Sequence, residues 1–220
     1  MGFPIMIIGE SGSGKSASMR SLPPESVGII NVAGKPLPFR STGFRTLDTD
    51  SYDKVRGALL GAKTDSLIID DAQYLMANQF MRDANKQGYQ KFTDLALNFW
   101  CLVQTVIHEL PRQRIVYFLM HLERDPNGNE KAKTIGRLLD EKITVEGMFT
   151  VVLKAVVKDG RYAFSTQNSG NDTVKSPIGM FDEPLIDNDL LYVDTTVRAY
   201  YGLPDLAAPK NTDASAEAAL

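Results

Sequence analysis

The chain has 220 residues, 43% of them hydrophobic and 23% charged, so it can bury one sizeable core and has the composition of an ordinary globular protein. The 24 basic and 27 acidic side chains give a net charge of −3, which excludes a polyanion partner attracted by overall charge alone. No apolar run approaches the roughly 18 residues of a membrane span, and no leader pattern opens the chain. We therefore expect a cytoplasmic protein without membrane contact.

The first predicted elements surround a glycine-rich segment. The apolar run 5–8 predicts a buried strand, and residues 15–20 predict the helix that follows. Between them, Gly9–Ser16 matches the template G-x-x-x-x-G-K-[ST] at every fixed position. In this setting the backbone N–H groups of the loop can surround a polyphosphate, and the start of the helix favours an anion. The sequence thus predicts a phosphate-binding loop; a Gly/Ser loop that only looks like the motif is the alternative.

Each part of this loop has an expected task. Lys15 is expected to reach the outer phosphates and assist catalysis, and Ser16 to bind Mg²⁺ directly. The expected cofactors are therefore a nucleoside triphosphate, taken as ATP, and Mg²⁺. The predicted nucleotide-binding residues are Gly9, Glu10, Ser11, Gly12, Ser13, Gly14, Lys15, Ser16 and Ala17.

The middle of the chain predicts strands that alternate with helices. Continuous apolar runs predict buried strands at 27–32, 66–70 and 115–120. Helical spacing or composition predicts helices at 51–60, 72–84 and 92–110, the last of which carries Cys101, the single cysteine, as a core thiol. Strands that are apolar throughout and alternate with helices indicate an α/β fold with a mostly parallel sheet covered on both faces.

Two carboxylates end the strand predicted at 66–70. Because ligands of open α/β sheets bind at the carboxyl ends of the strands, Asp70 is expected to hold Mg²⁺ through water while Ser16 binds it directly. Asp71 is expected to orient the attacking water as general base, although an aspartate is one methylene shorter than the usual glutamate. The alternative is that the two aspartates only cap the next helix.

His121 follows the strand predicted at 115–120, which places it beside the nucleotide as a catalytic sensor of the terminal phosphate. A histidine satisfied by a loop carbonyl is the alternative, and His108 is expected to be structural or exposed. Hydrolysis also needs a cation on the transferred phosphoryl group, often from a neighbouring subunit. The sequence does not choose among the candidates Arg112, Arg114, Lys131, Lys133 and Arg137.

Beyond His121 the pattern changes to turns and short strands. Turn residues at 125–129 and at 159–160 predict β-hairpins, with a short helix at 135–143 and a polar loop at 167–177. We expect one domain over residues 1–202, comprising a core to about residue 123, a β-rich part over about 124–180 and a final helix over about 188–202. A disordered tail is expected over 203–220.

Three segments in this order, GESGSGKS (9–16), SLIIDDAQYL (66–75) and FLMHLE (118–123), resemble the RecA-like and AAA-type phosphate-loop ATPases. More narrowly, they are similar to compact bacteriophage ATPases of single-strand annealing and recombination, as is the stretch 134–177. The resemblance implies a RecA-like or AAA-type core with added β-hairpins, ATP hydrolysis in the host cytoplasm, and a homo-oligomer that supplies a basic residue to the neighbouring site. It also implies single-stranded DNA and a single-strand DNA-binding protein as partners.

One departure matters, because RecA-type enzymes carry a glutamate base after the second strand and the segment 31–40, NVAGKPLPFR, has none. An ATP-switched loader or adaptor with little hydrolysis is therefore one alternative, and a small-molecule, nucleotide-type kinase is another. Such kinases close an arginine-rich lid, whereas the region after His121 predicts a hairpin. GTP selectivity is unsupported, since the segment 85–88, NKQG, lacks the aspartate of a guanine-reading motif.

The predicted DNA surface combines cations with aromatic side chains, a combination that suits single strands. A plain exposed hairpin is the alternative. The predicted surface residues are Lys131, Lys133, Lys154, Lys158, Arg161 and Lys175, together with Tyr162 and Phe164.

Overall fold

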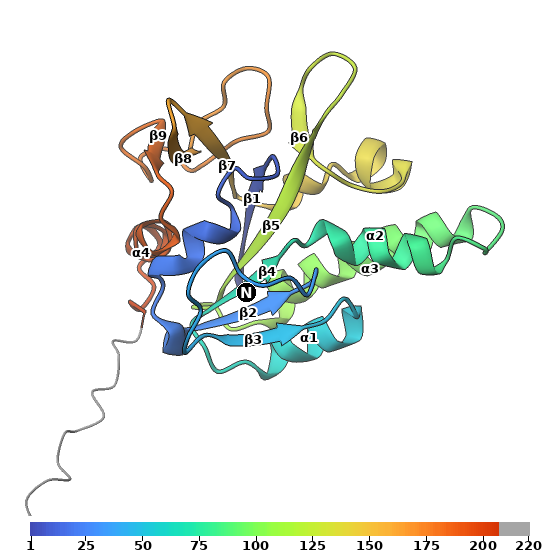
Figure 1. Ribbon diagram of the computed structural model, residues 1–220, viewed down its shortest axis with the longest axis horizontal. Helices are drawn as coiled ribbons and strands as arrows, with labels where there is room; N and C mark the ends of the chain where they lie inside the picture. Colours follow the sequence, from blue (N-terminus) through green and yellow to red (C-terminus); the bar gives the residue numbers. More distant parts are fainter. Residues whose placement is uncertain (207–220) are drawn as a thin grey trace, which may run out of the picture.

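The computed structural model describes residues 1–206 and has a mixed α/β architecture (Figure 1). Within these residues, nine strands form one sheet: β1 (Phe3–Gly9), β2 (Val27–Asn31), β3 (Arg45–Asp48), β4 (Ser66–Asp70), β5 (Ile115–Arg124), β6 (Glu130–Ala132), β7 (Val151–Lys158), β8 (Arg161–Ser165) and β9 (Leu185–Asp187). The α-helices are α1 (Tyr52–Gly61), α2 (Gln73–Arg82), α3 (Gln90–Glu109) and α4 (Leu190–Tyr201). Shorter helical turns are η1 (Ser16–Ser21), η2 (Pro24–Ser26), η3 (Leu138–Ile143) and η4 (Val145–Met148).

The sheet is mostly parallel, as predicted. Its strand order is β3-β2-β4-β5-β1-β7-β8-β9, and the strands from β3 to β7 in this order run parallel. The strands β8 and β9 add antiparallel, and β6 pairs antiparallel with β5. The two predicted hairpin turns are thus confirmed, one between β5 and β6 and the other between β7 and β8.

Helices cover both faces of the sheet, which explains why the strands are apolar throughout (Figure 1). The first face packs on α1, α2 and α3, and the second packs on η1 and α4. Along β1 the side chains alternate between these layers: Met6 and Ile8 belong to the first core cluster, and Ile5 and Ile7 to the second.

The carboxyl ends of the central strands bring several polar residues to one edge. β5 lies between β1 and β4 in the sheet. Gly9, at the end of β1, pairs in register with His121 of β5. On the other side of β4, Asn31 of β2 pairs in register with Asp70. This carboxyl-end edge therefore gathers the end of the glycine-rich strand, the acidic strand end and a histidine.

A second polar cluster lies at the opposite, amino-terminal edge of the sheet. Arg198 of α4 is 1% exposed and pairs with Asp194, which is fully buried. Asp194 also accepts hydrogen bonds from the Ser66 hydroxyl and the Tyr117 phenol. The guanidinium donates further to the Ser66 hydroxyl and to the carbonyls of Asp65, Gln113 and Pro204. The cluster fastens α4 to the starts of β4 and β5.

Several predicted elements differ from those observed. The helix predicted at 15–20 is the six-residue 3₁₀ turn η1, which is too short for a substantial helix dipole. The strand β5 continues past His121 to Arg124 because β6 pairs with this extension. The strands β3 and β9 were not predicted; every residue of β3 is exposed, so it lacks the apolar run used to find strands. The helix predicted at 135–143 is reduced to the π-helical turn η3.

The prediction that Cys101 is a core thiol is wrong, because this side chain is exposed. It lies on the outward face of α3 with Leu97 and Trp100, which are 51% and 37% exposed, whereas Phe99 and Val103 point into the core. The prediction of a disordered tail falls mainly on residues 207–220, outside the described residues. Within residues 1–206 no helix has both the length and the apolar character needed to cross a bilayer.

Candidate functional site

The glycine-rich loop, residues 9–16, connects β1 to η1 and has glycine where the geometry requires it. Gly14 has φ +92°, and a Cβ atom there would lie 2.8 Å from Cδ1 of Tyr162. A Cβ atom on Gly9 would lie 2.5 Å from Oγ of Ser13 and 2.9 Å from the Ala155 carbonyl oxygen. Glycine at positions 9 and 14 is therefore a steric requirement of this loop.

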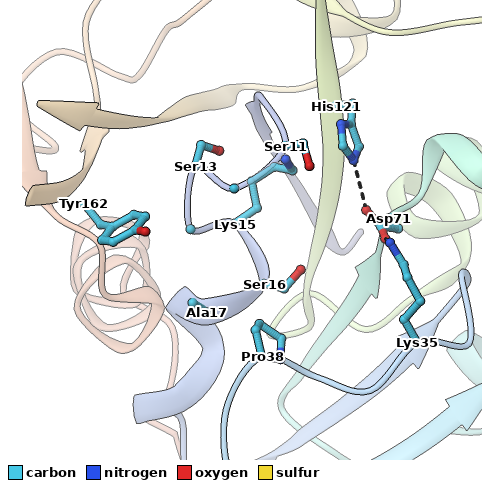
Figure 2. Close-up of a pocket in the computed structure, with 12 residues that line it drawn as sticks. Ser11, Ser13, Lys15, Ser16, Ala17, Lys35, Pro38, Asp71, His121 and Tyr162 are labelled. Atoms are coloured by element: carbon cyan, nitrogen blue, oxygen red, sulfur yellow. Dashed lines mark ion pairs between the residues drawn. The ribbon is translucent and has the colours of Figure 1, made fainter. Parts of the chain in front are cut away.

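The loop forms one wall of a cavity of about 440 Å³ (Figure 2). Residues 11–17 line this wall, which includes most of the predicted nucleotide-binding residues. Gly9 and Glu10 lie just behind the wall, where their carbonyls accept hydrogen bonds from Lys15. The remaining lining comes from distant segments and consists of Lys35, Pro38, Asp71, His121 and Tyr162.

Lys15 lies at the base of the loop, 6% exposed. Its ammonium donates to the carbonyls of Gly9 at 2.9 Å and Glu10 at 2.8 Å. Burial lowers the pKa of Lys15 to about 8, against the opposite influence of the nearby Asp71 and Asp70 carboxylates. A partly desolvated cation at the base of a glycine-rich loop is suited to bind an anion.

Ser16 and Asp70 meet although they lie 54 residues apart in the sequence. The Ser16 hydroxyl donates to Oδ1 of Asp70 at 2.8 Å. Burial raises the pKa of Asp70 to about 6, and the hydrogen bond from Ser16 opposes this shift. A hydroxyl and a carboxylate are oxygen ligands of the type that Mg²⁺ prefers. The pair therefore fits the predicted metal site.

Within residues 1–206 there is no group of three or more His, Cys, Asp or Glu side chains arranged to hold a metal. Mg²⁺ does not need such a group, because it usually keeps several waters and binds through one or two protein oxygens plus substrate phosphates. The Ser16–Asp70 pair can therefore bind Mg²⁺ only when phosphate oxygens of a bound ligand supply further coordination.

Asp71 has a left-handed backbone with φ +57°, a conformation that aspartate tolerates better than most residues. Its Oδ2 lies 2.9 Å from Nζ of Lys35, and its Oδ1 lies 3.4 Å from Nε2 of His121 (Figure 2). Burial opposes ionisation, but the hydrogen bonds from His121 and Lys35 outweigh it and hold the pKa of Asp71 well below its usual range. The carboxylate is therefore charged at neutral pH.

The alternative in which Asp70 and Asp71 cap the next helix is not realised. The N-cap of α2 is Ala72, and no side chain caps that end. The alternative for His121 is a ring paired with a loop carbonyl. Instead, its ring faces the Asp71 carboxylate, and its backbone N–H donates to Oε1 of Gln73. His108 is exposed on α3, as expected.

The basic residues considered for the phosphoryl group do not line the cavity of their own chain. Arg112 and Arg114 precede β5, at the opposite edge of the sheet. Lys131 pairs with Asp140, and Arg137 lies near Glu141. Lys35 lines the cavity instead, and no motif in the segment 31–40 assigns this lysine to the site.

The predicted DNA surface is wrong for Phe164, and a second member, Lys154, is engaged in ion pairs. Phe164 is fully buried because it pairs with Ile186 of β9 and belongs to the second core cluster. Lys154 is largely buried and forms ion pairs with Glu130 and Asp172. Phe164 is therefore not a surface residue, and the Lys154 ammonium is paired with two carboxylates. Tyr162 lies beyond the pairing with β9, is 53% exposed and faces the cavity.

No model of a known protein family matches this chain, and the search of curated proteins gave no match either. The assignment of a function therefore depends on the arrangement of the side chains just described.

Proposed function

We propose that this chain is a phosphate-loop NTPase with a RecA-like or AAA-type core, which binds ATP with Mg²⁺ and hydrolyses it to ADP and phosphate. One observation carries the proposal: the Ser16 hydroxyl at the end of the glycine-rich loop lies 2.8 Å from the Asp70 carboxylate. A loop that only mimics the motif has no reason to meet a carboxylate at the end of another buried strand.

The residues divide the work as follows. The backbone N–H groups of residues 11–16 and the Lys15 ammonium bind the phosphates, while the Ser16 hydroxyl and the Asp70 carboxylate hold the metal. Mg²⁺, when bound, neutralises the charge on the outer phosphates. Asp71 accepts a hydrogen bond from the attacking water and orients it, and His121 holds the Asp71 carboxylate in place.

The small-molecule kinase is less well supported. After β5 the chain forms the β5–β6 hairpin, in which Arg124 pairs with Glu10 and Glu130. This hairpin is not the arginine-rich lid that such a kinase closes over its substrates. The ATP-switched adaptor remains an alternative function, because the ion pair with Lys35 occupies the Asp71 carboxylate that would otherwise orient the attacking water. The resemblance also predicts two partners, single-stranded DNA and a single-strand DNA-binding protein, and assembly into a homo-oligomer. These remain predictions.

The test of the proposal is Lys15→Ala. We expect at least a 100-fold loss of ATP affinity and turnover, of the order of two strong charge-assisted hydrogen bonds, with the melting temperature little changed. Lys54→Ala, at an exposed position of α1, removes the same charge and should bind ATP normally. Full ATPase activity in folded Lys15→Ala would contradict the proposal.

A phosphate-release assay with and without single-stranded DNA distinguishes the enzyme from its alternatives. Release that DNA stimulates supports the ATPase acting on DNA. Transfer to a small metabolite without release indicates the kinase, and binding without release indicates the switch.

A further inference from the structure

A second basic side chain reaches the cavity from the loop that follows β2. Lys35 lines the cavity opposite the glycine-rich loop, and its Nζ lies 2.9 Å from Oδ2 of Asp71 (Figure 2). Its side chain is 63% exposed, in contrast to the buried Lys15. Lys35 is therefore a cation of the same chain that faces the space where the phosphates of a nucleotide would end.

The backbone of Lys35 is held in place although its side chain is exposed. The side-chain Nδ2 of Asn31 donates to the Lys35 carbonyl at 2.8 Å and to Oδ1 of Asp48 at 3.0 Å. Between them, Gly34 adopts φ +63° and its N–H donates to the Asn31 carbonyl. Because Asn31 pairs in register with Asp70, this anchoring ties Lys35 to the strand end that carries the acidic residues.

The contact between Lys35 and Asp71 can be exchanged. An ion pair with so exposed a lysine contributes little to stability. Asp71 keeps a second partner in His121, so the departure of Lys35 does not leave its carboxylate isolated. Lys15 is buried at the base of the glycine-rich loop, whereas the exposed Lys35 lines the opposite side of the cavity, so the two ammonium groups can contact a phosphate chain at different points. A terminal phosphate offers the Lys35 ammonium more charge and more acceptor oxygens than a carboxylate does.

We propose that Lys35 is a ligand of the terminal phosphate, contributed in cis, and that it leaves Asp71 when a triphosphate binds. The proposal rests on the proposed function, because it requires a nucleotide in this cavity. A triphosphate draws the Lys35 ammonium away and frees Oδ2 of Asp71 to orient a water. A diphosphate lacks the group that competes for Lys35, so the ion pair persists. The pair thus distinguishes triphosphate from diphosphate within one chain.

Calorimetric titration of the full chain with AMP-PNP and with ADP, each with Mg²⁺, tests this. Lys35→Met should weaken AMP-PNP binding by about 10-fold or more, the loss expected for one charge-assisted hydrogen bond, and change ADP affinity by less than about twofold. Lys35→Arg should keep most of the AMP-PNP affinity because it keeps a cation. Lys54→Met is the matched control and should change neither affinity.

A double variant separates contact with phosphate from mere neutralisation of Asp71. Asp71→Asn releases Lys35 and should tighten AMP-PNP binding, and adding Lys35→Met should remove the gain and weaken binding further. If the double variant binds AMP-PNP as tightly as Asp71→Asn, Lys35 only neutralises Asp71 and the inference is wrong.

Equal losses for AMP-PNP and ADP in Lys35→Met would also overturn the inference, as would no loss for either. In both cases the wild type still binds nucleotide, so the proposed function stands. A wild type that binds neither nucleotide would instead overturn the proposed function and the inference with it.

Discussion

The two ends of the sheet each carry a carboxylate paired with a basic side chain, and they differ in how completely the pair is enclosed. At the amino-terminal end, Arg198 is 1% exposed and its donors are distributed over Asp194, a hydroxyl and three carbonyls. At the carboxyl end, the side chain of Lys35 is 63% exposed and meets Asp71 at the mouth of a cavity. The first pair has no room for a ligand, and the second does.

This difference separates a structural ion pair from a candidate site more clearly than residue type does. A buried pair is costly to break because the remaining charge stays desolvated. A pair with one exposed member costs little to exchange, because water or a ligand can replace the lost partner. We therefore expect changes at the amino-terminal end to affect folding, and changes at the carboxyl end to affect binding and turnover.

The largest expected effect is on stability. Asp194→Ala should lower the free energy of unfolding by about 3–5 kcal/mol, since it leaves the Arg198 guanidinium buried without its counter-charge. Urea denaturation monitored by circular dichroism measures this loss, and Asp194→Asn, which keeps two of the hydrogen bonds possible, should lose less. A change below about 1 kcal/mol would mean that the enclosed pair behaves like a surface pair, and the comparison would fail.

At the carboxyl end, Asp71→Asn should reduce turnover by a factor of roughly 10² or more, the size of a lost general base, while stability is retained and the triphosphate binds at least as tightly as it does to the wild type. Single-turnover phosphate release and equilibrium binding measure the two effects. Asp70→Asn is the informative partner, because it should weaken Mg²⁺-dependent binding itself. Hydrolysis at the wild-type rate in Asp71→Asn would place the base elsewhere.

The smallest expected effects come from two tyrosines, one at each end. Tyr162→Ala should weaken nucleotide binding about 10-fold if the exposed ring stacks on the base, a contact that contributes about 1–3 kcal/mol, and should leave stability unchanged. Tyr117→Phe should lower stability by about 1 kcal/mol, because it removes the hydrogen bond to Asp194, and should leave binding unchanged. Fluorescent-nucleotide titration and urea denaturation of both variants measure the effects. The reverse pattern would contradict the comparison.

The parts of the site that the sequence predicts are those encoded by short, continuous segments. A short motif is enough to identify the glycine-rich loop, and an apolar run is enough to identify the strand ending in Asp70. The hydrogen bond between Ser16 and Asp70 confirms that the two segments lie side by side. Lys35 and Tyr162 could not be assigned to the cavity, because they come from separate loops and strands whose positions depend on the folded sheet.

Two of the wrong predictions have a common cause, because they concern residues whose exposure depends on tertiary contacts. Cys101 fits an apolar helical pattern, but the outward face of α3 is itself rich in apolar residues. Phe164 lies two residues from the exposed Tyr162 on the same strand, and it is buried because it pairs with Ala155 of β7 and Ile186 of β9 and belongs to the second core cluster. A periodic pattern shows which residues share a face, and not whether another element covers that face.

The position of β1 in the sheet has a consequence for how this protein is made. β1 is synthesised well before its two neighbours in the sheet, β5 and β7, which contribute Ile115 and Val151 to the pairing. The ribosome must therefore produce most of the chain before the glycine-rich loop has a sheet to hold it. Such distant pairings slow folding, and until they form, the apolar β1 offers unpaired edges to chaperones or to other nascent chains.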